Sequence, residues 1–213
     1  DLFEGLAIER LEANKGAEAW KAYPVFLFDF NGADYQAGGA LEKSLDTQLK
    51  RFEMVYGYDE QFSEIGERFQ NLLIRAEQKT GQRSVVLVDE YDKPLLDTVD
   101  NKELQEHNRA VLKGFFSTLK SFDNYFQFIF ITGVTKFHKV SIFSDLNQLK
   151  DISLSDSYAD ICGITEEELI QYFGDRIPAF ARKQEMTAEE CLAKLRKTYD
   201  GYRFHTLAKG VYN

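Results

Sequence analysis

Three short apolar runs constrain the fold of this 213-residue chain more than any other feature. They lie at residues 24–30, 84–89 and 126–132, and each is rich in β-branched or aromatic side chains. Nearly continuous apolarity without strict alternation is typical of strands that are buried on both faces. Helical patterns separate the runs, and strands that alternate with helices indicate βαβ crossovers. The sequence therefore predicts an α/β fold with a mostly parallel sheet and flanking helices.

The helical patterns between these runs are regular. Apolar residues recur at intervals of three and four in three segments. These residues are Leu41, Leu45, Leu49, Phe52 and Val55, then Phe62, Ile65, Phe69, Leu72 and Ala76, and finally Leu104, Val111, Leu112, Phe115, Leu119 and Phe122. A weaker fourth strand is predicted at residues 152–154. We place the α/β core at residues 1–154.

The pattern changes after residue 154. Thr165 and Glu168 have the spacing of a helix capping box, and so do Thr187 and Glu190. A helical repeat follows the second box, and Gly201 is expected to end that helix. Residues 155–213 are therefore predicted to form a small helical subdomain.

The charge and the cysteine content indicate which partners and which cellular compartment suit this chain. The chain has 26 Lys and Arg against 35 Asp and Glu, a net charge of −9, which does not support a nucleic-acid partner. An acidic chain is also repelled by anionic membranes, and no apolar run approaches the roughly 20 residues of a membrane span. Two thiols, Cys162 and Cys191, in a chain large enough to bury its own core fit a reducing cytoplasm. A single disulfide is the alternative.

The sharpest local motif is the run at residues 85–88 followed by Asp89 and Glu90. Four apolar residues before Asp-Glu form the Walker B pattern of P-loop ATPases, and ligands of α/β sheets bind at the carboxyl ends of strands. Asp89 would hold Mg²⁺, in most such enzymes through a water, and Glu90 would orient the water that attacks the γ-phosphate. The alternative is that two acids end a strand in a solvated loop.

Two further residues are candidates for phosphate contacts. Thr132 ends the next predicted strand, where a small polar side chain could sense the γ-phosphate in the sensor-1 role. The alternative is an ordinary exit from a strand through a glycine turn. Arg203 in Tyr-Asp-Gly-Tyr-Arg-Phe could bind a phosphate with its guanidinium fork, or it could be a surface residue beside a packed aromatic turn.

No phosphate-binding loop of the form G-x-x-x-x-G-K-[ST] occurs in these residues. The glycines at positions 32, 38 and 39 follow the first predicted strand, but no Gly-Lys-Ser/Thr accompanies them. We interpret residues 31–39 as a loop.

Taken together, these segments resemble the AAA-ATPase-like family of bacterial proteins. The resemblance rests on residues 2–8, 23–25, 88–95, 132–137, 140–147 and 199–204, and above all on Val-Asp-Glu-Tyr-Asp-Lys-Pro and Tyr-Asp-Gly-Tyr-Arg-Phe. It implies a P-loop NTPase fold with a helical lid, ATP and Mg²⁺ as cofactors, Asp89 and Glu90 as the Walker B pair and Thr132 as sensor 1. Many members also carry a PD-(D/E)xK nuclease-like domain beyond the matching region.

Members of this family have their Walker A loop ahead of the segment that matches residues 2–8, and the sequence here starts after it. We therefore expect ATP hydrolysis only with an upstream Walker A segment, and weak or no Mg·ATP binding by residues 1–213. The strand of that loop lies centrally in such sheets, next to the strand that corresponds to residues 126–132. Upstream residues, another segment or a different strand pairing could fill that position.

Two other functions stay open at this point. The chain could be a nucleotide-independent interaction module, with some of its many Phe and Tyr residues forming a contact patch. A weaker hypothesis is that Asp89, Glu90 and Asp92 bind a metal for phosphodiester hydrolysis.

Overall fold

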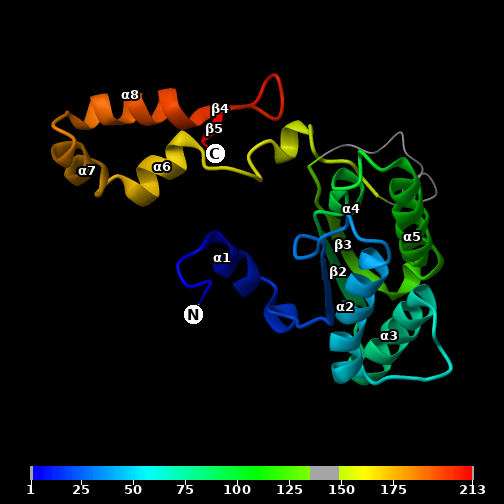
Figure 1. Cartoon of the computed structure of the whole chain (residues 1–213). Helices are drawn as coiled ribbons and strands as arrows, with labels where there is room; N and C mark the ends of the chain where they lie inside the picture. Colours follow the sequence, from blue (N-terminus) through cyan, green and yellow to red (C-terminus); the bar gives the residue numbers. More distant parts are fainter. Residues whose placement is uncertain (1, 135–148, 213) are drawn as a thin grey trace. The chain divides into compact units, whose positions relative to one another are not determined.

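The computed structural model describes residues 2–134 and 149–212 (Figure 1). The chain divides into two compact units, Asp1–Gln148, called unit 1, and Leu149–Asn213, called unit 2. Unit 1 holds a parallel sheet with its helices, whereas unit 2 holds shorter helices and a small antiparallel pair of strands. Residues 140–147, which contributed to the family resemblance, lie outside the described part.

The sheet of unit 1 has three parallel strands in the order in which they occur along the chain. They are β1 (Val25–Asp29), β2 (Ser84–Asp89) and β3 (Phe126–Ile131). Phe28 lies opposite Val88, and Val88 lies opposite Ile131. All three predicted strands are present, and the predicted α/β class with a parallel sheet is confirmed.

The three long helices of the crossovers match the predicted repeats. α2 (Ala40–Tyr56) and α3 (Ile65–Thr80) connect β1 to β2, and α4 (Lys93–Leu96) and α5 (Lys102–Ser121) connect β2 to β3. The short α4 was not predicted. The Asn101 side chain caps α5 by accepting a hydrogen bond from the Leu104 N–H. A short 3₁₀ turn, η2 (Asp123–Tyr125), leads from α5 into β3.

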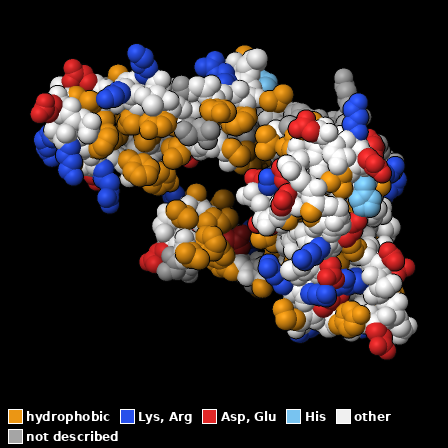
Figure 2. Space-filling view, viewed as in Figure 1, with side chains coloured by type: hydrophobic (Ala, Val, Ile, Leu, Met, Phe, Trp, Pro, Cys, Tyr) orange, Lys and Arg blue, Asp and Glu red, His pale blue; other side chains and the backbone are white. Residues whose placement is uncertain are grey.

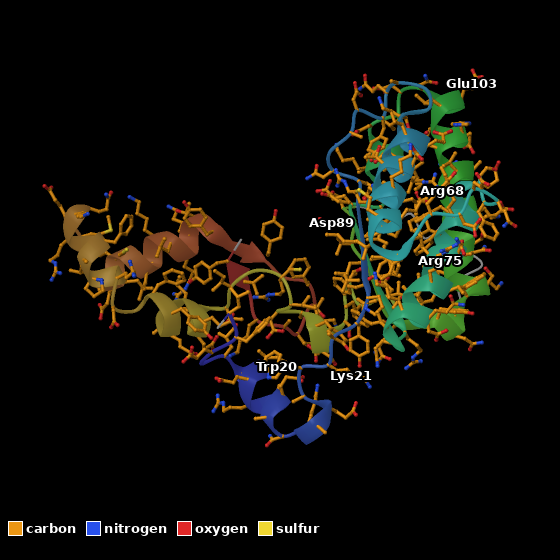
Figure 3. All side chains as sticks on the ribbon, turned by 90° about the horizontal axis from the view of Figure 1, so that it is seen from below. Trp20, Lys21, Arg68, Arg75, Asp89 and Glu103 are labelled. Atoms are coloured by element: carbon orange, nitrogen blue, oxygen red, sulfur yellow. The ribbon has the colours of Figure 1, made fainter. Side chains whose placement is uncertain are left out.

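The core of unit 1 is a cluster of aromatic rings between the sheet and three helices. Phe28 of β1 packs edge-on against Phe52 of α2, Phe69 of α3 and Phe115 of α5, with ring centroids 4.8–5.5 Å apart. Burial of each such ring contributes about 1.5–3 kcal/mol. Because α2, α3 and α5 all contact the same β1 ring, they cover one face of the sheet, as Figure 3 shows.

The opposite face of the sheet is largely open, so the prediction that the strands are buried on both faces is wrong. Val25 and Leu27 of β1 are 47% and 50% exposed, and Phe128 of β3 is 53% exposed. The register places Val25, Val85 and Phe128 side by side on this face. We call it the open sheet face. Continuous apolarity identified the strands, but it could not reveal that all three long helices pack on one side.

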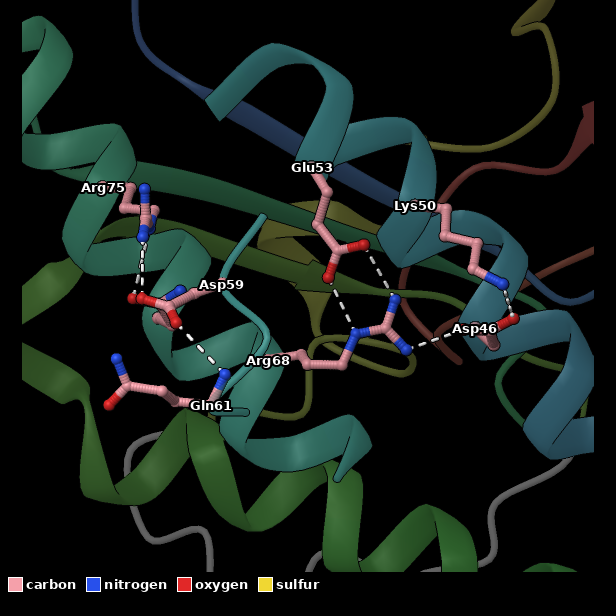
Figure 4. A network of polar contacts seen from close by, with 8 residues as sticks. Asp46, Lys50, Glu53, Asp59, Gln61, Arg68 and Arg75 are labelled. Carbon is pink, nitrogen blue, oxygen red and sulfur yellow. Dashed lines mark hydrogen bonds and ion pairs between the residues drawn. The ribbon is translucent and has the colours of Figure 1, made fainter. Parts of the chain in front are cut away.

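An ion network that is buried at Arg68 and Glu53 ties α2 to α3 (Figure 4). The Arg68 guanidinium donates to both carboxylate oxygens of Glu53, at 2.7 and 2.9 Å, and to Asp46 Oδ1 at 2.7 Å. Lys50 donates to the other oxygen of Asp46 at 2.8 Å. The hydrogen bond from Lys50 and then that from Arg68 hold the pKa of Asp46 below its usual value.

Unit 2 begins with a 3₁₀ turn, η4 (Asp156–Tyr158), followed by α6 (Glu166–Phe173), α7 (Ile177–Lys183) and α8 (Ala188–Tyr199). β4 (Asp200–Tyr202) and β5 (Val211–Tyr212) pair antiparallel after these helices. Its small core joins α7 to α8 through Ile177, Ala181 and Cys191. Both Cys162 and Cys191 are free thiols, so the disulfide alternative is not borne out.

Local predictions for unit 2 meet with mixed results. The capping box of Thr165 and Glu168 is present, and Thr187 and Glu190 bond each other in the same reciprocal way. The predicted strand at residues 152–154 is wrong, because this segment forms coil and a turn. Gly201 does not end α8 as a left-handed cap either, because it lies within β4 without a positive φ.

The amino-terminal segment of unit 1 forms α1 (Ala7–Ala13) and a 3₁₀ turn, η1 (Gly16–Glu18). The rings of Phe3 and Trp20 stack with centroids 5.1 Å apart, and Glu12 accepts the Trp20 N–H at 2.8 Å. Across residues 2–134 and 149–212, no helix combines the length and the apolarity that crossing a membrane requires.

Candidate active site

The chain turns sharply where β2 ends, and two of the candidate residues lie at that turn. Asp89 is the exposed last residue of β2, on the open sheet face and away from Arg68 and Arg75 (Figure 3). Glu90 follows with φ of +51°. A left-handed backbone is uncommon for a residue with a long side chain and costs on the order of 1–3 kcal/mol unless the surroundings impose it. Because of this left-handed backbone, the chain at Glu90 no longer follows the direction of β2.

Thr132 lies directly after β3 and contacts both residues of that turn. Its N–H donates to the Val88 carbonyl at 2.8 Å, and its own carbonyl accepts the Tyr91 N–H at 3.1 Å. The hydroxyl donates to the Asp89 carboxylate and accepts the Glu90 N–H at 3.4 Å. The structure therefore brings Asp89, Glu90 and Thr132 together at the carboxyl ends of neighbouring parallel strands.

Beyond Thr132, the loop that follows β3 packs against the loop that follows β2. The Val134 N–H donates to Asp92 Oδ1 at 3.2 Å, and the Asp92 side chain is completely buried. Gly133 leaves no room for a side chain, because an added Cβ would lie 2.6 Å from the Tyr91 ring and 2.8 Å from Asp92 Oδ1. From the sequence, Gly133 was expected only as part of a turn, and its contact with Asp92 was not predicted.

Asp29 is a second residue that the sequence analysis did not single out. It ends β1 directly opposite Asp89 in the register, so the two carboxylates lie on the same face of strands about 4.8 Å apart. Its carboxylate accepts the Asn31 N–H at 2.7 Å, and its own N–H donates to Gln48 Oε1 at 2.8 Å. An acid at the end of the neighbouring apolar run was the signal that could have found it.

A cavity of about 630 Å³ opens beside the end of β1. Asp29, the loop of residues 32–39 and one side of α2 line it, with Lys43 and Arg51 as its cations. The interpretation of residues 31–39 as a loop is confirmed, and Gly39 adopts a φ of +77° immediately before α2. Asp29 is thus the link between this cavity and the Asp89 site.

Two candidate residues remain, Arg203 and Asp92. Arg203 belongs to unit 2, where it is exposed directly after β4, and its phosphate-binding role stays a prediction. Asp92 turns toward Val134. Within residues 2–134 and 149–212, no three Asp, Glu, His or Cys side chains form a cage for a metal, so the three-acid hypothesis gains no support from the geometry.

The donors that are present suit one hydrated, hard cation. An exposed carboxylate and a hydroxyl, Asp89 and Thr132, are oxygen ligands of the kind that Mg²⁺ takes while it keeps most of its waters. Two side chains from two strands are enough for that mode of binding. The Asp89 carboxylate is therefore a suitable ligand for Mg²⁺, and the binding of Mg²⁺ at this residue stays a prediction.

Comparisons with known proteins identify the family of this chain. Residues 1–143 match the family described as Predicted AAA-ATPase. An uncharacterised protein from the region 5′ of vnfD in Azotobacter chroococcum mcd 1 is 33% identical in an alignment of 215 residues that covers all of this chain. The chain spans 38% of the length of that relative. No solved structure matches. Because the family match covers residues 1–143, more than half of the chain, the chain belongs to the AAA-ATPase-like family.

Proposed function

We propose that the whole protein binds Mg·ATP and hydrolyses it at the turn after β2. One observation carries this proposal: the Thr132 hydroxyl bonds both the Asp89 carboxylate and the Glu90 N–H, at the point where α/β sheets bind ligands. A strand end that merely met solvent would not need a left-handed Glu90 to meet a hydroxyl from the neighbouring strand. Strained residues of this kind cluster at functional sites.

Each residue has a role that follows from its position. Bound Mg²⁺ would neutralise the charge that develops on the phosphate oxygens. Asp89, as an exposed carboxylate, would hold that cation through a water. Glu90 would accept a proton from the attacking water and orient it, and Thr132 would use its hydroxyl to position the same water or the γ-phosphate.

This chemistry requires a phosphate-binding loop that residues 1–213 do not contain. Without backbone N–H groups and a lysine to cradle the phosphates, we expect residues 1–213 to bind Mg·ATP weakly or not at all. Calorimetry would contradict this expectation if it gave micromolar affinity for residues 1–213.

The test is Glu90→Gln in the whole protein, which keeps the size of the side chain and removes the base. General base catalysis contributes about 10²- to 10⁴-fold, so kcat should fall by at least about 100-fold while ATP still binds. Glu103→Gln is the matched control, because Glu103 is exposed in the first turn of α5 (Figure 3). If Glu90→Gln hydrolyses ATP at the wild-type rate, Glu90 is not the base.

Unit 2 is proposed to act as the lid of this site. Arg203 would bind a phosphate when the lid closes, since its guanidinium suits bidentate contact. Arg203→Ala should then raise the KM for ATP in the whole protein. A reducing cytoplasm as the location, which the two thiols suggest, remains a proposal. A nuclease-like domain linked to this region remains a proposal that the family resemblance implies.

An interaction module is the second candidate function, and exposed apolar surface favours it. Figure 2 shows hydrophobic side chains gathered over α6 and α7, where Ile170, Tyr172, Phe173 and Phe180 are exposed. The open sheet face adds a second apolar surface. The module hypothesis predicts that the whole protein lacks ATP turnover and that Asp89→Ala leaves its biological activity unchanged.

A further inference from the structure

Asp92 uses its carboxylate in an unexpected way. It occupies the N-cap position of α4, where an Asp side chain normally accepts a hydrogen bond from the first turn of the helix. No such capping bond is made here. The carboxylate, which is completely buried, instead accepts the Val134 N–H from the loop after β3. The Asp92 side chain therefore joins the loop after β2 to the loop after β3 and does not cap α4.

The loop after β3 is shaped to receive that carboxylate. Gly133 does not have a positive φ, so its backbone conformation is open to other residues. Position 133 requires glycine because there is no space for a side chain, since any Cβ would come closer than 3.0 Å to both Tyr91 and Asp92. The loop after β3 thus approaches the loop after β2 closely for two independent reasons. The Asp92 carboxylate accepts a hydrogen bond from it, and position 133 carries no side chain.

The contact has a consequence for Thr132, which precedes Gly133. Besides the bonds of the Thr132 hydroxyl, three hydrogen bonds from backbone N–H groups hold this stretch to the β2 side: Thr132 N–H to Val88, Tyr91 N–H to Thr132, and Val134 N–H to Asp92. The bond from Val134 to Asp92 is the last of the three along the chain, and it holds the loop two residues after Thr132. Without it, only the bonds of Thr132 itself would hold this loop to the β2 side.

We propose that Asp92 is a positioning residue, which holds the Thr132–Val134 loop so that the Thr132 hydroxyl stays directed at Asp89 and Glu90. This inference rests on the proposed ATPase function. Asp92 itself touches no substrate and acts through Thr132. A misplacement of about 1 Å at a reacting group can cost about 100-fold in rate, so loss of this one anchor is large enough to measure.

The experiment compares variants of the whole protein on both sides of the hydrogen bond. Asp92→Ala removes the acceptor, and Val134→Pro removes the donor at a residue whose side chain is exposed. Asp92→Asn keeps an acceptor oxygen but loses the charge. Thr98→Val is the structural control, because Thr98 is buried nearby and donates a hydrogen bond to the Pro94 carbonyl at 2.8 Å.

We expect Asp92→Ala and Val134→Pro each to lower kcat by about 10- to 100-fold, with the KM for ATP changed less than about threefold. The double variant should lose little more than either single one, because both remove the same bond. Asp92→Asn should recover most of the lost rate, and Thr98→Val should lower thermal stability without this effect on kcat. Hydrogen exchange at the amides of Tyr91 and Val134 should accelerate in Asp92→Ala.

Several results would overturn the proposal. Wild-type kcat in folded Asp92→Ala would show that the anchor is not needed. An equal loss in Asp92→Asn and Asp92→Ala would assign the effect to charge, and an equal loss in Thr98→Val would assign it to general stability. If the wild-type protein itself lacks ATP turnover, the proposed function fails. Amide exchange would then still decide whether Asp92 holds the loop, since unchanged exchange would remove the anchor as well.

Discussion

Replacement of Arg68 by Met should be the most destabilising single change in the interface between α2 and α3. Arg68 and Glu53 are each 8% exposed, and the guanidinium donates to both oxygens of the carboxylate. Arg68→Met would leave the Glu53 charge buried without its partner (Figure 4). Loss of one member of a buried ion pair typically costs about 3–5 kcal/mol. We expect about that loss here.

Two companion variants separate this effect from loss of packing. The double change of Glu53→Leu with Arg68→Met replaces the charged pair by apolar side chains, and it should be more stable than Arg68→Met alone. Arg75→Met is the control, because the Arg75–Asp59 pair is partly exposed at 32% and 23%. Exposed pairs contribute about 0–1 kcal/mol, so this control should lose little.

Native-state hydrogen exchange of the α2 and α3 amides is the suitable assay, since it reports the opening of unit 1 separately from unit 2. A loss of about 3 kcal/mol corresponds to exchange accelerated by about 100-fold at the best-protected amides. The reasoning would be refuted if Arg68→Met cost no more than Arg75→Met. It would also fail if the double variant lost as much as the sum of the two single ones.

Three further predictions follow from named contacts. The pKa of Asp46 is lowered in the folded state, so its contribution is present above the unfolded pKa of about 3.9 and is lost as pH falls below it. Asp46→Asn should therefore flatten the dependence of unfolding free energy on pH below about pH 4, and an unchanged slope would contradict the assignment. Gly133→Ala should cost about 1–3 kcal/mol in a denaturation experiment, because its Cβ meets the buried Tyr91 ring, whereas Gly114→Ala inside α5 has open space and should stabilise. Glu90→Gly should raise stability by about 1 kcal/mol by relieving the left-handed backbone, and a loss of stability would show that the Glu90 side chain has structural contacts worth more.

The candidate site shows how far a linear motif reaches. Asp89, Glu90 and Thr132 could be singled out because each follows an apolar run, and the carboxyl ends of parallel strands lie at one edge of a sheet. Their chemical roles remain predictions, although the structure brings the three together. Asp29 could not be paired with Asp89 beforehand, because only the register of β1 on β2 places them opposite each other.

The sequence by itself determined the three strands and the three long helices of unit 1 and the two capping boxes of unit 2. These features depend on periodicity and on contacts between residues three or four apart, so they depend only on residues that are close together in the sequence. Only the tertiary structure decided which face of the sheet stays open, how Arg68 finds Glu53, and that Asp92 turns from its own helix to Val134. Such pairings join residues 15 and 42 positions apart, and the physical reason is that the direction of each helix and loop across the sheet sets them.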